Sequence, residues 1–151
     1  MNSSIGDVFW ETLTLLFEKL MRYARLEFGN MIMKYNMVWE VYMFEGFEEL
    51  TDKDFYEKAM AGEKPAVVLL TTPENSYNHS LYQVLVKYQR IYGDKINFYW
   101  LDVSKNTSAE DLGVFSFPTV LYFRDTMELE RHDYVPSEED VEKAIRRLLR
   151  L

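Results

Sequence analysis

Ser76 and His79 are the residues whose types and spacing most suggest catalysis, because three positions place a hydroxyl and an imidazole on one helical turn. A serine hydroxyl activated by a neighbouring histidine is the nucleophile of many hydrolases. The sequence offers no identifiable acid to orient this imidazole and no oxyanion donor. We therefore predict that the chain is not an enzyme, and cysteine-free catalysis at this corner stands as a distant alternative.

Thiol and metal chemistry are limited by composition, since the 151 residues include no cysteine. Disulfides, thiol catalysis, Cys-ligated zinc and Fe–S clusters are thereby excluded. The two histidines, His79 and His132, are distant in sequence, so a shared metal site would require a tertiary coincidence. The acidic stretch of residues 45–63 does not match a calcium loop and is typical of a solvated face. We expect no metal and no cofactor.

Charge and hydropathy limit the partners. With 25 acidic and 17 basic side chains, the formal net charge is -8, which disfavours binding to a nucleic-acid backbone. Apolar residues make up 48% of the chain and aromatic residues 16%, enough for a packed core. No uncharged run approaches the roughly 18 to 20 residues that span a bilayer, and no secretory pattern is present. We expect a soluble, cytoplasmic protein that binds neither nucleic acid nor membrane.

Residues 7–28 carry the first periodic signal, an amphipathic helix with a wide apolar face. The large apolar side chains on this face are Phe9, Trp10, Leu13, Leu16, Phe17 and Leu20. Such a face packs on its own domain, on a partner subunit or on a membrane surface. The polar face lacks the Lys/Arg excess of membrane-surface helices. We expect these residues to form a homo-oligomer interface, most simply in a dimer.

The remaining chain alternates strand and helix patterns. We expect strands near residues 38–50, 66–70, 96–103, 119–123 and 127–134, and helices near 51–61, 75–92, 107–112 and after Ser137. Thr51 and Ser137 are expected to cap the helices that follow them, with Asp54 placed for a capping box. Residues 31–37 fit either pattern. The class is therefore α/β, with a helix between most of the strands.

This order of elements resembles that of the thioredoxin family, and local segments agree with it. Lys64–Leu70 is similar to the family's central strand, Trp100–Val103 to the strand that usually ends in Asp, and Val114–Thr119 to the segment with its cis proline. Glu49–Phe55 is similar to the entry into its first helix. The resemblance implies a three-layer α/β/α domain over 45–151 with a mixed central sheet. It also implies a cis Phe117–Pro118 bond and an N-terminal extension and connecting segment over 1–44.

The family's redox motif is missing. The resemblance places its Cys-x-x-Cys on Asn75–Asn78, its preceding Trp at Glu74, and its buried acid on an apolar residue near Leu69. Only a thiolate forms the mixed disulfide on which exchange depends. The resemblance therefore implies the scaffold without the oxidoreductase activity.

The corner that carries chemistry in the family is our candidate site, as a groove between a helix start and a proline-initiated strand. Its residues are Glu74, Asn75, Ser76, Tyr77, Asn78, Phe117 and Pro118. We expect it to bind an extended peptide or protein segment, as an adaptor or chaperone-like module. In a plainer interpretation Asn75 or Ser76 only caps the helix, Tyr77 is half exposed and Pro118 serves topology. The alternative function is a structural, oligomer-forming protein whose N-terminal helix makes the interface.

Overall fold

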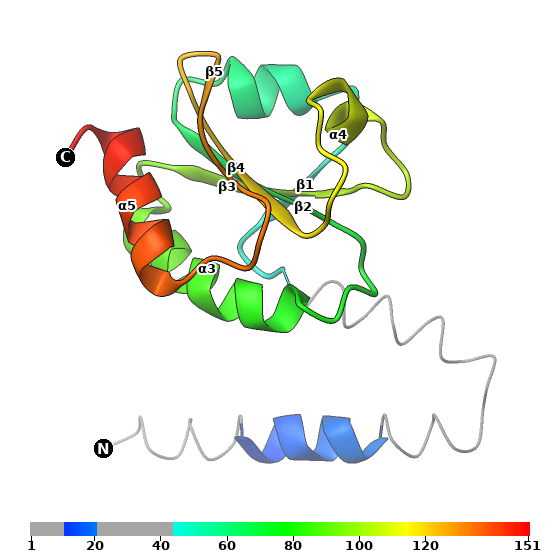
Figure 1. Ribbon diagram of the computed structural model, residues 1–151. Helices are drawn as coiled ribbons and strands as arrows, with labels where there is room; N and C mark the ends of the chain where they lie inside the picture. Colours follow the sequence, from blue (N-terminus) through cyan, green and yellow to red (C-terminus); the bar gives the residue numbers. More distant parts are fainter. Residues whose placement is uncertain (1–10, 21–43) are drawn as a thin grey trace. The chain divides into compact units, whose positions relative to one another are not determined.

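The computed structural model describes residues 11–20 and 44–151 (Figure 1). The chain divides into two units, Met1–Tyr42 and Met43–Leu151. In the first unit residues 11–20 are helical, and the other residues of the helix expected over 7–28 lie outside the described part. The open stretch of residues 31–37 also lies outside it.

The second unit is a mixed α/β structure built on a five-stranded sheet, which confirms the predicted α/β class. Its strands are β1 (Glu48–Leu50), β2 (Ala66–Thr71), β3 (Asn97–Asp102), β4 (Thr119–Arg124) and β5 (Met127–His132). They lie in the order β1-β3-β2-β4-β5. The first three are parallel, whereas β4 is antiparallel to β2 and β5 to β4. The carboxyl ends of β2 and β3 therefore lie at the same end of the sheet as the amino end of β4.

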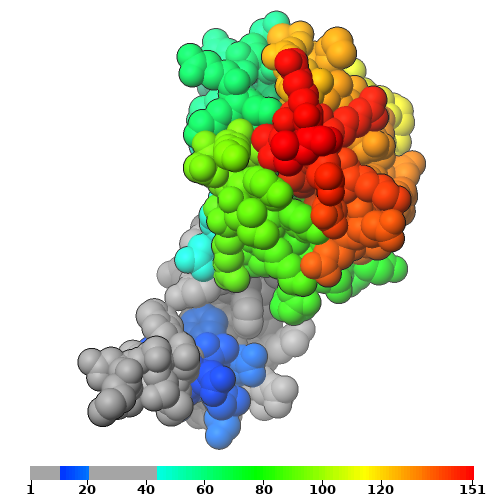
Figure 2. Space-filling model, turned by 90° about the vertical axis from the view of Figure 1, so that its left-hand side faces the viewer, coloured from blue at the N-terminus to red at the C-terminus, as the bar shows by residue number. Residues whose placement is uncertain are grey.

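Helices cover both faces of this sheet. One face carries α3 (Asn78–Tyr92) and α5 (Glu138–Leu149), and the other carries the π-helical turn η1 (Tyr56–Met60) and the short α4 (Ser108–Asp111) (Figure 1). Figure 2 shows α3 in green and α5 in orange to red, side by side. The Tyr88 hydroxyl links them by donating to the Glu138 carbonyl at 3.0 Å.

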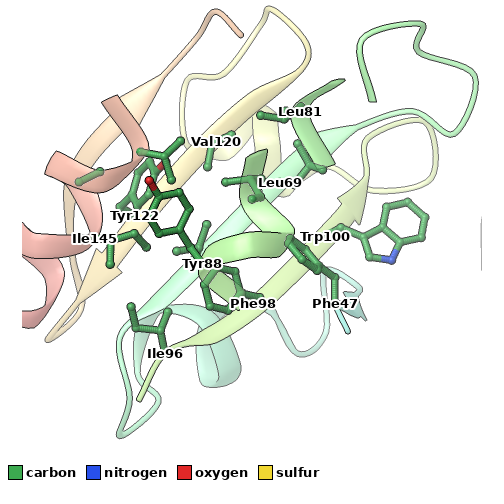
Figure 3. Close-up of a cluster of buried hydrophobic side chains, with 14 of the residues drawn as sticks. Phe47, Leu69, Leu81, Tyr88, Ile96, Phe98, Trp100, Val120, Tyr122 and Ile145 are labelled. Carbon is green, nitrogen blue, oxygen red and sulfur yellow. The ribbon is translucent and has the colours of Figure 1, made fainter. Parts of the chain in front are cut away.

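Alternation along the strands divides the core into two apolar layers. In β2, Val67 and Leu69 face the α3 and α5 layer, whereas Val68 and Leu70 face the η1 and α4 layer. Figure 3 shows the first layer, in which strand residues meet helix residues. The residues labelled there are Phe47, Leu69, Leu81, Tyr88, Ile96, Phe98, Trp100, Val120, Tyr122 and Ile145. A strand that is buried on both faces has an almost continuous run of apolar residues in its sequence, as β2 has.

The first strand is much shorter than expected. Among the described residues of the predicted 38–50 strand, 44–46 form a turn, in which the Phe47 N–H donates to the Phe44 carbonyl at 2.9 Å. Gly46 has a φ of 85°, which other residues rarely adopt. The Phe44 ring instead stacks on Trp100, with 4.6 Å between ring centroids. Phe44 and Phe47 thus belong to the core and lie outside β1.

Local capping signals had mixed outcomes. Ser137 caps α5 in a reciprocal capping box with Asp140, in agreement with its expected role as the N-cap. Asp54 accepts from the Thr51 N–H at 2.7 Å as expected, but the helix that follows is π-helical, with the Ala61 N–H donating to the Tyr56 carbonyl. The helix expected from residue 75 begins only at Asn78.

Asp52 holds the segment after β1 against α4. Its carboxylate accepts from the backbone N–H groups of Thr107 and Ser108, at 2.9 and 2.8 Å, and from the Ser108 hydroxyl at 2.5 Å. These hydrogen bonds, led by the one from Ser108, hold the pKa of Asp52 below its usual value. The acid supplies from a distant loop the cap that α4 lacks in its own sequence.

Candidate functional site at the end of the sheet

The register of β2 and β4 brings the two halves of the predicted site together. Leu70 pairs with Thr119, so the loop after β2 (72–77) and the loop before β4 (113–118) emerge at the same end of the sheet (Figure 1). The first loop contains Glu74, Ser76 and Tyr77, and the second contains Phe117. Residues separated by some forty positions thus belong to one end of the domain.

Asn78 is a structural residue rather than a surface contact. It is fully buried, and its Oδ1 accepts from the Thr71 hydroxyl at 2.7 Å. Its Nδ2 donates to the Thr72 carbonyl at 2.8 Å and more weakly to the Pro73 carbonyl at 3.5 Å. The side chain ties the start of α3 to the end of β2. The expected contact of Asn78 with a ligand would require these hydrogen bonds to break, because both ends of the amide are already used inside the protein.

The loop before Asn78 presents the remaining polar residues. The Asn75 Oδ1 accepts from the Tyr77 N–H at 3.0 Å, a local turn in place of the expected helix cap. Glu74 and Ser76 are exposed, and 58% of Tyr77 is accessible. This loop therefore offers a carboxylate, a hydroxyl and a phenol ring to the solvent.

The opposite loop contains the expected cis Phe117–Pro118 peptide bond, so this prediction is confirmed. Pro118 is buried, whereas 37% of Phe117 is accessible. Within the described residues, neither the N–H nor the carbonyl of Phe117 forms a hydrogen bond. Nearby, the Thr119 hydroxyl donates to the Ser116 carbonyl at 2.7 Å and fixes the turn. Phe117 is thus partly exposed, and its backbone groups are unpaired within the described residues.

Two further segments of this end were missed by sequence reasoning. Phe115 is 79% accessible, and Tyr134 and Val135 are exposed in the loop that follows β5. Because Val120 pairs with His132, that loop leaves the sheet beside the start of β4. A signal for Phe115 existed in the Phe-Ser-Phe-Pro sequence, where alternation puts Phe115 and Phe117 on one side. Tyr134 could be placed only once the strand register was known. We call Tyr77, Phe115, Phe117, Tyr134 and Val135 the sheet-end surface.

A buried pair lies directly beneath Tyr134. His132 is almost fully buried, and its Nδ1 lies 3.2 Å from the Tyr122 hydroxyl. Its ring centroid is 5.5 Å from that of Tyr134. Burial lowers the pKa of His132 and raises the pKa of Tyr122, so both are neutral near pH 7. The pair supports the loop and supplies no charge to the surface.

The described residues at this end of the sheet do not form a serine–histidine catalytic pair. The His79 Nε2 lies 3.1 Å from the Gln83 Nε2, and within the described residues Ser76 and His79 form no hydrogen bond with each other. No group of three or more metal-ligating side chains occurs in the part of the chain that the structure describes. No helix among the described residues is long and apolar enough to cross a membrane.

The residues expected at an oligomer interface are described in part. In the helix of residues 11–20, Leu13, Leu16 and Leu20 are 41%, 59% and 55% accessible, and Phe17 is half-buried. Phe9 and Trp10 lie outside the described residues. No protein-family model and no curated protein matches this chain.

Proposed function

We propose that this chain is a redox-inactive member of the thioredoxin-like proteins and that it binds an extended segment of a partner protein. The strand order β1-β3-β2-β4-β5, with helices on both faces, supports the family assignment. So does a cis proline immediately before β4. The proposed domain is residues 45–151, preceded by a helical extension.

The proposed activity is binding without chemistry. A chain without cysteine cannot form a mixed disulfide, and Asn75 and Asn78 stand where the resemblance places the two redox residues. Asn78 fills its buried position with an amide that holds the β2 end and the α3 start together. These hydrogen bonds support a site of fixed shape, in which the amide forms no covalent bond with a partner.

The observation that carries the proposal is the state of Phe117. Its backbone N–H and carbonyl have no partner within the described residues, although β4 begins only two residues later. An extended segment can use such groups for main-chain hydrogen bonds, while its side chains supply specificity. The rings of Phe117 and Tyr77 would then cover apolar side chains of the segment, as aromatic residues do at many interfaces.

Selection from a random peptide library on the full chain tests this proposal. We expect selected peptides to lose at least about tenfold in affinity when Tyr77 and Phe117 are both changed to Ala, since central aromatic side chains dominate such interfaces. The matched control is Tyr56→Ala with Ile91→Ala, two large side chains on η1 and α3 that are at least as exposed as Tyr77 and Phe117. Equal losses in both double variants, or a library without binders, would refute the proposal.

A second candidate function is oligomer formation through the N-terminal helix. It is favoured by the apolar face of the described helix, on which Leu13, Leu16 and Leu20 lie at helical spacing. We expect the full chain to sediment as a dimer, and the Leu13→Asp, Phe17→Asp variant to sediment as a monomer. A full-length chain that remains monomeric across micromolar concentrations contradicts this candidate. Unfolding of the variant would instead assign the helix to the monomer's own core.

A further inference from the structure

The loops of the sheet-end surface contain acids and no bases. Residues 72–77, 113–118 and 133–137 include no Lys or Arg, but they include Glu74 and Asp133, which are both exposed. At the end of α4, where the second loop begins, Glu110 and Asp111 are exposed as well. None of these four carboxylates forms an ion pair within the described residues.

Of the described cations at this end of the domain, three are already paired, whereas Lys53, which follows the carboxyl end of β1, is exposed and forms no ion pair. Lys87 pairs with Glu138 at 2.9 Å, and Lys105 lies 3.8 Å from the buried carboxylate of Asp102. The third is Arg131, which pairs with Glu128 while also donating to the carbonyls of Leu112 and Gly113. Among the described residues, the unpaired carboxylates around the aromatic and apolar sheet-end surface therefore outnumber the unpaired cations, and the rim is negative on balance.

We infer that the segment bound at the sheet-end surface combines apolar side chains with lysine or arginine. This inference rests on the proposed function and adds the charge of the partner. Apolar side chains pack on Phe115, Phe117 and Val135, while cationic groups reach the carboxylates of Glu74 and Asp133. Tyr77 and Tyr134 also offer ring faces to a cation. The same rim would repel an acidic segment. The charge of the rim would therefore both attract cationic segments and discriminate against acidic ones.

Two labelled pools of degenerate nonapeptides provide the test, with fluorescence anisotropy on the full chain as the measurement. Both pools have five central positions drawn from Leu, Ile, Val, Pro and Phe. One is flanked by pairs of Lys and the other by pairs of Glu. We expect the Lys-flanked pool to bind about tenfold more tightly at low salt, with the difference shrinking as added salt screens the exposed carboxylates.

Charge reversal at the rim identifies the residues responsible. Glu74→Lys with Asp133→Lys should abolish or invert the preference between the pools. Glu57→Lys with Glu63→Lys is the matched control, because it changes the net charge equally at exposed acids on η1 and before the amino end of β2. The control should retain the preference.

The outcomes separate this inference from the proposed function. Peptides that bind through Tyr77 and Phe117 with equal affinity for both pools, or with preference for the Glu pool, overturn the inference and leave the proposed function standing. Failure of both pools to bind at any salt concentration overturns both. If the rim variant and the control variant lose the preference equally, the preference depends on the overall net charge of the protein. That result would also overturn the inference.

Discussion

Replacement of Asn78 by Ala should destabilise the domain through the loss of one buried amide. The two strong hydrogen bonds to Thr71 and Thr72 measure 2.7 and 2.8 Å, and each contributes on the order of 1 kcal/mol to the free energy of unfolding. The Thr71 hydroxyl keeps only a 3.3 Å contact with the Thr72 carbonyl, so it is left poorly satisfied in a buried position. We therefore expect a total loss of about 2 to 3 kcal/mol.

Urea unfolding of the full chain, followed by far-UV circular dichroism, measures this loss. The matched control is Asn75→Ala, since Asn75 is the same residue type three positions earlier but makes a single 3.0 Å side-chain bond at the surface. We expect the control to lose less than about 1 kcal/mol. A double-mutant cycle with Thr71→Val should reveal coupling between the two buried partners. An Asn78→Ala variant within about 0.5 kcal/mol of the parent chain would refute the assignment of Asn78 as a structural tie.

Three further predictions concern stability. Burial lowers the pKa of His132 in the folded chain below its unfolded value near 6.5. The contribution of the buried neutral ring to the free energy of unfolding is therefore complete above pH 6.5, and it should be lost as the pH falls toward the lower folded pKa. His132→Gln should flatten the unfolding free energy in that pH window, and an unchanged slope would argue against burial of a neutral imidazole. The pKa of Asp52 is lowered, so its contribution to the free energy of unfolding should disappear only below pH 3.8, the ordinary pKa of an Asp carboxyl. Below that pH the Asp52→Asn variant should therefore lose less free energy of unfolding than the parent chain, as acid unfolding would measure. Ser137→Ala should lower the thermal midpoint by removing the α5 cap, at a cost of about 1 kcal/mol, and an unchanged midpoint would contradict the capping role.

The elements that the sequence predicted well are those whose signals are local. Ala66–Thr71 reads as a buried strand because nearly all of its side chains are apolar, and it is one. Ser137 followed by Asp140 is a short-range capping pattern, and the geometry depends on those residues alone. The cis bond at Pro118 was expected from the resemblance of a short segment.

The features that sequence reasoning missed depend on long-range contacts. The predicted strand of residues 38–50 included Phe44 and Phe47, but Phe44 lies in a turn and stacks on Trp100, more than fifty positions away. Asn78 was expected to hydrogen-bond a ligand, and its internal partners could not be foreseen because Thr71 and Thr72 become its neighbours only when the loop folds back on β2. Likewise, the inclusion of Tyr134 in the sheet-end surface follows from the β4 and β5 register. No local pattern encodes these three placements.

The outer strands of the sheet determine how copies of this domain can associate. Within the described residues β1 is an edge of only three residues, two of which are exposed glutamates. The other edge, β5, carries Glu128, Glu130 and Arg131, and its register with β4 shifts between Tyr122 and Phe123. Short, charged or irregular edges discourage the addition of a strand from another molecule. The sheet therefore resists growth into a continuous intermolecular sheet, and crowded chains should remain free of fibrous aggregates that extend through their strand edges.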